Sequence, residues 1–142
     1  MSTTAKGTLD QERAKHAWEV VKKMLELFPH HPPRVPNGKR EPHAHAKAFG
    51  GAARKLPVRI MASGLGQALA FLKAKGKTKE LLDALGGWVL RDQKLKDLLD
   101  AVIQGTADTL RMHTAETLAY LQWLNRFCEA NNLTDDTNSD GG

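Results

Sequence analysis

Residues 106–130 read TADTLRMHTAETLAYLQWLNRFCEA and form the longest helical pattern in the chain. Thr106 is a favourable N-cap. The apolar residues of one predicted face are Leu110, Leu121, Leu124 and Cys128, and those of a second side are Met112, Ala119, Trp123 and Phe127. A helix that is apolar on two sides is either central in its bundle or half covered by a partner protein, and the central position is the commoner case. We therefore predict that this helix is central in the bundle and that the Cys128 thiol packs in its apolar face and is unreactive.

Five further helical patterns precede this segment. They run from Thr8 to Phe28, from about Phe49 to Ser63, from Leu65 to Lys75, from Thr78 to Val89 and from Asp92 to Ile103. Thr8, Thr78 and Asp92 are the predicted N-caps, and Pro57 predicts a kink or a restart in the second helix. The chain shows no alternating strand pattern and no sequence repeat. These features predict an all-α fold, a compact bundle of about six helices in a single domain covering residues 1–133.

Two segments have few core-forming residues. Residues 29–42 contain five prolines and predict an exposed loop, and residues 134–142 predict a disordered acidic tail. No apolar run approaches the ~18 residues of a membrane span, and the first residues lack the apolar stretch of a secretory signal. A single cysteine excludes an internal disulfide framework. We expect a cytoplasmic protein with no membrane contact.

The charge is unevenly distributed along the chain. Residues 1–79 hold 16 Lys and Arg against 5 Asp and Glu, whereas residues 80–142 hold 5 against 11. The 38 residues between Glu41 and Glu80 carry eight cations and no anion. Their counter-charge comes either from the acidic C-terminal half or from a polyanion such as nucleic acid, unless the cations form a solvated face.

The patterns that would indicate catalysis or metal binding are weak. Gly64-Leu65-Gly66 lacks the third glycine and the preceding strand of a dinucleotide-binding motif. His43 and His45 point away from each other on a helix, and His113 with Glu116 lacks a second such pair to complete a metal site. We therefore predict no catalytic residues, no metal and no cofactor.

Three groups of basic residues are candidates for binding a polyanion. Lys55 and Arg59 are four positions apart and share one helix face. A lysine cluster closes the third helix, where the helix dipole also favours cations; its members are Lys73, Lys75, Lys77 and Lys79. Arg111, Gln122 and Arg126 form a polar stripe about 22 Å long, which fits several phosphates or a solvated face equally well.

The segment from Ala53 to Gly76, ARKLPVRIMASGLGQALAFLKAKG, resembles the signature of the small helical subunit of type III-B CRISPR effector complexes, the Cmr complex. Two weaker blocks are similar to the same family. They are Leu81-Leu82-Asp83 followed by Trp88, and Arg111 followed by Thr114-Ala115-Glu116 and by residues 121–127, LQWLNRF. The resemblance covers about residues 8–131. Neither the proline-rich stretch nor the acidic tail has a counterpart in it.

The resemblance implies a compact α-bundle without catalytic activity. Several copies would stack head to tail beside the backbone subunits of a guide-RNA complex and line the channel that holds the single-stranded target RNA. The RNA-facing residues it implies are Lys55, Arg59, Lys73, Arg111 and Arg126, to which the lysine cluster adds Lys75 and Lys77 as candidates. Phosphate contacts would position the RNA while guide pairing reads its sequence.

Two alternatives remain open. One is a free-standing helical nucleic-acid-binding protein, although the helix that contains Gln67 is too apolar to read bases, and the aromatic residues are placed on core faces. The other is an adaptor held by helix packing, for which RNA contact is incidental. The resemblance itself implies other Cmr subunits, neighbouring copies of the chain, guide RNA and target RNA as partners, and an adaptor would still join its complex after charge reversal at Lys55, Arg59 and Arg111.

Overall fold

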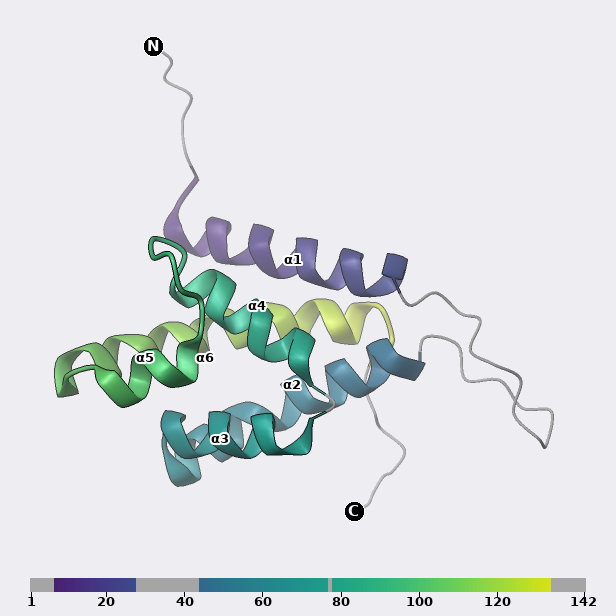
Figure 1. Ribbon diagram of the computed structural model, residues 1–142. Coiled ribbons are helices and arrows are strands. Elements are labelled where there is room, and N and C mark those ends of the chain that lie inside the picture. Colours follow the sequence, from purple (N-terminus) through teal and green to yellow (C-terminus); the bar gives the residue numbers. More distant parts are fainter. Residues whose placement is uncertain (1–6, 28–43, 77, 134–142) are drawn as a thin grey trace, which may run out of the picture.

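The computed structural model describes residues 7–27, 44–76 and 78–133, and six α-helices account for most of them (Figure 1). The helices are α1 (Leu9–Leu27), α2 (Ala44–Ser63), α3 (Leu65–Lys75), α4 (Lys79–Val89), α5 (Leu98–Gln104) and α6 (Ala107–Ala130). No strand occurs in these ranges, so the predicted all-α bundle is confirmed. The predicted loop at 29–42 and the predicted tail at 134–142 lie outside the described residues.

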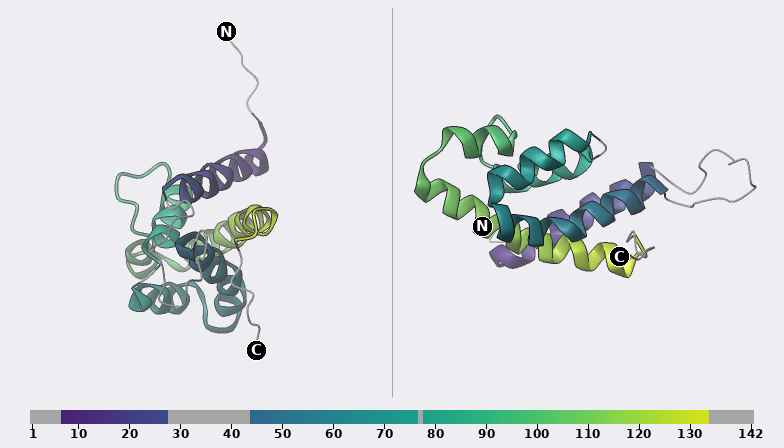
Figure 2. Two further views of the ribbon diagram at one scale, coloured as in Figure 1. Left: turned by 90° about the vertical axis from the view of Figure 1, so that its right-hand side faces the viewer. Right: turned by 90° about the horizontal axis from the view of Figure 1, so that it is seen from below.

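The longest helix, α6, is the central one. It packs against α1, α2, α4 and α5. In the left view of Figure 2, α6 is seen nearly end-on between α1 above it and α2 below it. The shorter helices lie mostly to the left of α6 in this view. The helices α2 and α3 form a hairpin that covers the lower side of the bundle in Figure 1. None of the described helices is long and apolar enough to span a membrane.

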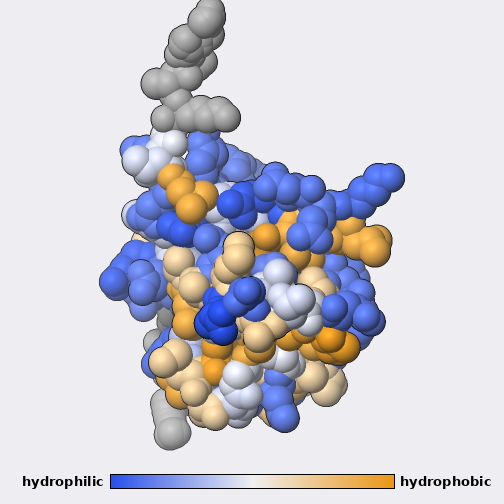
Figure 3. All heavy atoms as spheres, turned by 90° about the vertical axis from the view of Figure 1, so that its left-hand side faces the viewer, coloured by the Kyte–Doolittle hydropathy of each residue, from blue (hydrophilic) through white to orange (hydrophobic). Residues whose placement is uncertain are grey.

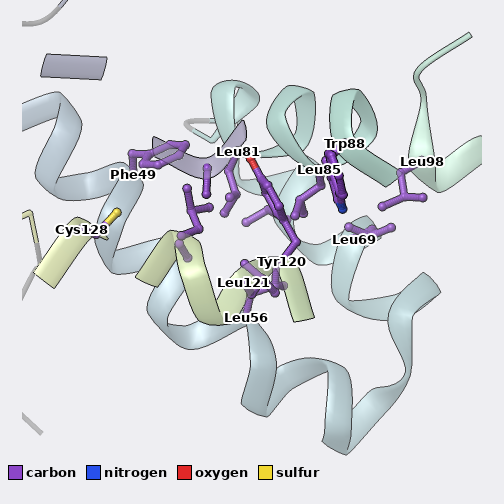
Figure 4. Close-up of a cluster of buried hydrophobic side chains, with 14 of the residues drawn as sticks. Phe49, Leu56, Leu69, Leu81, Leu85, Trp88, Leu98, Tyr120, Leu121 and Cys128 are labelled. Atoms are coloured by element: carbon purple, nitrogen blue, oxygen red, sulfur yellow. The ribbon is translucent and has the colours of Figure 1, made fainter. Parts of the chain in front are cut away.

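The core is built around α6 (Figure 4). Tyr120 and Leu121 are both fully buried, and they meet Leu56 of α2 and Trp88 of α4. The rings of Trp88 and Tyr120 stack with centroids 6.1 Å apart. Cys128 is buried further along the same helix, where burial raises the pKa of its thiol to about 12. The prediction that Cys128 is buried packing is confirmed.

The second apolar side of α6 packs against α1. The Trp123 indole N–H donates to Asp10 Oδ1 at 3.0 Å, and the rings of Phe127 and Trp18 lie 5.4 Å apart. Met112, earlier on the same side, is 67% exposed. The predicted central position of α6 is therefore confirmed, except over its first turns.

Two of the predicted N-caps are confirmed. The Gln11 N–H donates to Thr8 Oγ1 at 3.1 Å, and the Thr109 N–H donates to Thr106 Oγ1 at 3.1 Å. Thr78 precedes α4 as predicted, but its side chain does not cap that helix. Its hydroxyl is buried and donates to the Leu72 carbonyl at 3.0 Å, which satisfies a carbonyl in the last turn of α3 instead.

The predicted start of the fifth helix at Asp92 is wrong. The helix begins at Leu98, and Asp97 caps it by accepting from the Asp100 N–H at 3.1 Å. Residues 91–97 form turns and irregular structure, so Leu95 is 75% exposed rather than part of the core. The Lys96 ammonium donates to the carbonyls of Leu90 and Arg91 at 2.8 and 2.9 Å, which holds this segment against the end of α4 and keeps it out of a helix.

Pro57 does not restart the second helix, because α2 continues through it. Proline has no N–H, so the carbonyl of Ala53, four residues earlier, loses its helical donor. Asn125 of α6 replaces that donor: its side-chain amide donates to the Ala53 carbonyl at 3.0 Å. A hydrogen bond from a second helix therefore permits proline at this position.

His16 of α1 lies between two aromatic rings of the core. Its ring centroid is 5.6 Å from that of Trp88 and 5.4 Å from that of Tyr120, and its Nδ1 lies 2.8 Å from the Tyr120 hydroxyl. Burial lowers the pKa of His16, and the positive charge of Arg91 lowers it further. The folded state therefore favours the neutral imidazole.

We expect the chain to lose stability as the pH falls through 6.5, the ordinary pKa of histidine. Above that pH His16 is neutral in both states, whereas below it the unfolded chain takes up the proton more readily than the folded one. Denaturant titrations at a series of pH values between about 5 and 8 will measure the effect. The His16→Asn variant is expected to show a flatter profile, and an unchanged slope in that variant would contradict the assignment to His16.

Candidate nucleic-acid interface

Most of the described cations of the basic stretch have no ion-pair partner among the described residues. Within the described part of the chain, Lys79 pairs with Asp83 at 3.1 Å, but no carboxylate lies within 4 Å of the other described cations between residues 42 and 78. These cations are Lys47, Arg54, Lys55, Arg59, Lys73 and Lys75. The described carboxylates of the C-terminal half therefore do not supply their counter-charge, and a polyanion or solvent is among the other possible sources.

Most of the described carboxylates in the C-terminal half are engaged elsewhere. Glu80 lies 3.2 Å from His45, and Glu129 lies 3.5 Å from Arg126. Glu116 accepts hydrogen bonds from Arg13 of α1. Of these three carboxylates, Glu129 therefore pairs locally, whereas Glu80 and Glu116 each join two helices.

Arg59 and Lys75 are brought together by Phe71, an aromatic ring that is not among the predicted site residues. The guanidinium carbon of Arg59 on α2 lies 3.8 Å from the ring centroid of Phe71 on α3, and the Lys75 ammonium lies 5.3 Å from it. Phe71 and Lys75 are one turn apart on α3. This i, i+4 spacing is the sequence signal that could have identified Phe71 as a neighbour of the basic residues. The contact with Arg59 depends on the α2–α3 hairpin.

Lys55 lies on α2, and Arg126 lies on the neighbouring helix α6. Lys55 is exposed one turn before Arg59. Arg126 lines a shallow groove of about 360 Å³ together with Pro57 and Asn125, the residue that donates to the Ala53 carbonyl. The structure therefore places Arg126 beside the proline of the basic helix.

Lys73 faces a different part of the surface. It borders a groove of about 490 Å³ between α3, α4 and α5, whose floor is apolar. Leu72, Leu82 and Leu98 belong to this floor. Lys77, the third member of the predicted lysine cluster, lies outside the described residues.

Arg111 lies near the start of α6, toward the opposite end of the helix from Arg126. It is 73% exposed and forms an ion pair with Asp108, one turn earlier on α6. At 1.5 Å per residue it lies about 22 Å along the helix from Arg126.

Figure 3 shows one side of the molecule, where apolar side chains gather among charged ones. Two exposed apolar residues near the α5–α6 turn are Ile103 and Met112, each 67% exposed.

The predicted residues therefore lie at several places on the surface. Lys55, Arg59 and Lys75 share the α2–α3 surface, Arg126 lies beside α2, and Lys73 and Arg111 face elsewhere. This arrangement offers phosphates a set of unpaired cations on one helical hairpin and isolated cations around it. Among the described residues, no three His, Cys, Asp or Glu side chains converge in a way that could hold a metal ion.

Comparison with known proteins gives three consistent results. The family model described as "CRISPR-associated protein (Cas_Cmr5)" matches residues 9–131. A Thermus thermophilus protein named "CRISPR system Cmr subunit Cmr5" is 38% identical over 81 residues, which cover 55% of this chain and 69% of that protein. The crystal structure of a CRISPR-associated Cmr5 family protein from the same organism superposes with a TM-score of 0.66. At 28% identity it covers 91% of this chain and 100% of the other.

Proposed function

Because the chain belongs to the Cmr5 family of CRISPR-associated proteins, we propose that it is a non-catalytic small subunit of a type III-B (Cmr) complex, which targets RNA in antiviral defence. In this role its basic residues contact the backbone of the target RNA or of its duplex with the guide. Copies of the chain stack against one another beside the other Cmr subunits. The guide RNA supplies sequence specificity.

The observation that carries this proposal is the set of unpaired cations on α2 and α3. Lys55, Arg59 and Lys75 have no carboxylate within 4 Å in the described part of the chain, and they project from one helical hairpin. Placing like charges together without counter-charges is unfavourable unless a polyanion binds to them. Phosphate contacts of this kind position RNA without reading its bases.

Stacking between copies is supported by exposed apolar side chains. Ile103 and Met112 are exposed around the α5–α6 turn, and Met61 at the end of α2 is 75% exposed. Exposed apolar side chains of this size favour a protein partner. A contact between the basic half of one copy and the acidic half of the next has less support, because most of the described carboxylates of the acidic half already have partners within the chain.

We expect the triple variant Lys55→Glu/Arg59→Glu/Lys75→Glu to bind target RNA roughly tenfold more weakly or worse in the assembled complex, because each reversal replaces a phosphate contact by repulsion. The measurement is binding of single-stranded target RNA to complexes reconstituted with either protein, at salt concentrations between about 50 and 200 mM. The slope of log affinity against log salt is expected to become shallower by about one for each phosphate that the variant no longer neutralises.

A matched control changes the same number of charges elsewhere. Lys15, Lys23 and Lys94 are exposed cations outside the α2–α3 hairpin, and their reversal to glutamate leaves affinity and salt slope close to the wild-type values. If the first triple variant also assembles and supports target cleavage at wild-type affinity, the chain is an adaptor and the RNA contact is incidental. If the purified chain recovers mixed nucleic acid but no Cmr subunits from cells, it is a free-standing binder. A Lys55→Glu/Arg59→Glu protein that sediments as normal stacks will show that stacking does not depend on these charges.

A further inference from the structure

The exposed phenylalanine of α3 lies within the basic surface. The buried residues of α3 are Leu65, Ala68, Leu69 and Leu72, whereas Phe71 is 42% exposed. The side chains on its ring are cations: the Arg59 guanidinium carbon lies 3.8 Å from the ring centroid and the Lys75 ammonium 5.3 Å from it. A large aromatic ring is therefore kept at the surface between two positive charges.

Among the described residues, the other exposed aromatic side chain has a different environment. Trp18 on α1 packs against Phe127, which in turn stacks on Trp123, so its ring belongs to an aromatic row between α1 and α6. The cation over Trp18, that of Lys22, is itself paired with Glu19 at 3.8 Å. By contrast, Phe71 has no aromatic neighbour within the described part of the chain, and no carboxylate there pairs with its cations. Packing explains Trp18 but leaves the exposure of Phe71 unexplained.

The Arg59 guanidinium carbon lies 3.8 Å from the ring centroid, so a planar cation and an aromatic ring are in contact at the surface. Unpaired nucleobases stack on aromatic rings and on arginine guanidinium planes, and nearby lysines contact the phosphates on either side. Lys75 beside the ring, and Lys55 one turn from Arg59, are exposed cations that can fill the second role. All the parts of a site for one nucleotide are thus present on the α2–α3 hairpin.

We propose that the Arg59–Phe71 pair is a stacking site for an unpaired nucleobase of the RNA strand. This inference rests on the proposed function, and it adds that the surface contacts a base as well as phosphates. Bases inside a continuous duplex are already stacked, so the site takes a single-stranded or extruded nucleotide. It therefore gives the chain a preference for single-stranded over double-stranded RNA that phosphate contacts alone do not provide.

The test uses the full chain and a short single-stranded RNA with one 2-aminopurine, whose fluorescence is quenched when it stacks. We expect Phe71→Ala to weaken binding about tenfold and to abolish the quenching, while the salt slope falls by no more than about one because the phosphate contacts remain. Phe71→Trp retains both affinity and quenching. Phe71→Leu, which keeps the apolar volume but has no π-face, behaves as Phe71→Ala does. Leu95→Ala, at an exposed leucine outside this surface, is the matched control and binds as the wild type does.

RNAs with abasic sites separate stacking from an indirect effect on Arg59. If a base stacks on this pair, an RNA with abasic positions binds the wild type as weakly as normal RNA binds Phe71→Ala, and the two effects do not add. If Phe71→Ala weakens normal and abasic RNA by the same factor, the ring only positions Arg59 and the stacking site is refuted. If Phe71→Ala binds normally while charge reversal at Lys55 and Arg59 weakens binding, the proposed function stands and this inference fails. If neither change affects binding, both fail.

Discussion

Gly86→Ala is expected to destabilise the chain by about 3 kcal/mol or more, because the new methyl group has no space. A Cβ at position 86 would lie 1.8 Å from the backbone carbonyl oxygen of Lys96. That carbonyl belongs to the segment that the Lys96 ammonium anchors to the carbonyls of Leu90 and Arg91 at the end of α4. Either α4 or residues 91–97 must therefore move, and Asp97, the cap of α5, moves with them.

The neighbouring glycine is the control for this experiment. A Cβ at position 87 would have His16 Nε2 as its nearest neighbour at 3.6 Å, which is an ordinary van der Waals distance. Alanine is a better helix former than glycine by about 1 kcal/mol, so Gly87→Ala is expected to be neutral or mildly stabilising. Chemical denaturation followed by circular dichroism measures both variants. Equal stabilities for the two would contradict the close approach of α4 to residue 96.

Glu116→Ala is expected to lower the free energy of unfolding by roughly 2–4 kcal/mol, because it leaves buried donors without an acceptor. The Glu116 carboxylate on α6 accepts from Nη2 of Arg13 at 2.9 Å and from the indole N–H of Trp88 at 2.7 Å, and it also accepts from Nε of Arg13. Arg13 and Glu116 have side chains only 16% and 18% exposed. One carboxylate thus joins α1, α4 and α6.

The pH dependence gives a second readout for Glu116. Hydrogen bonds from Arg13, and secondarily from Trp88, lower the pKa of the Glu116 carboxyl below its ordinary value of 4.5. Its contribution is therefore complete above that pH and is lost as the pH falls toward the lowered pKa. The Glu116→Ala variant is expected to lose less stability on acidification than the wild type.

Asp108 provides the matched control for removing a carboxylate. It pairs with Arg111 on the same helix, but its side chain is 80% exposed, so Asp108→Ala is expected to cost less than about 1 kcal/mol. The denaturant midpoints of the two variants measure the loss of stability that each substitution causes. A Glu116→Ala protein as stable as Asp108→Ala would show that the contact between the three helices contributes little.

The local sequence predicted most of the helices but not every boundary. Thr8 and Thr106 cap their helices as expected, since each hydroxyl is followed three residues later by the N–H from which it accepts. Asp92 and Asp97 are equally good caps by composition. The choice of Asp97 depends on the Lys96 contacts at the end of α4, which a pattern along the chain does not reveal.

The candidate RNA-binding surface was predicted in part. Lys55, Arg59 and Lys75 follow from their charge and from the resemblance, and the structure adds that they lack ion pairs in the described part of the chain. Phe71 was not predicted as a site residue, because aromatic residues at helical spacing are usually core. Only the structure shows that the Phe71 ring is exposed and that the α2–α3 hairpin brings Arg59 onto it.

The sequence by itself determined the class of the fold, the position of α6 and the uneven charge, because helical periodicity, N-capping and net charge depend on residues near one another. The tertiary structure decided which side chains from distant segments meet. It placed Asn125 at the carbonyl that Pro57 leaves free, and it joined Glu116 to Arg13. These contacts depend on how the helices pack, and helix packing follows from the whole core rather than from any one segment.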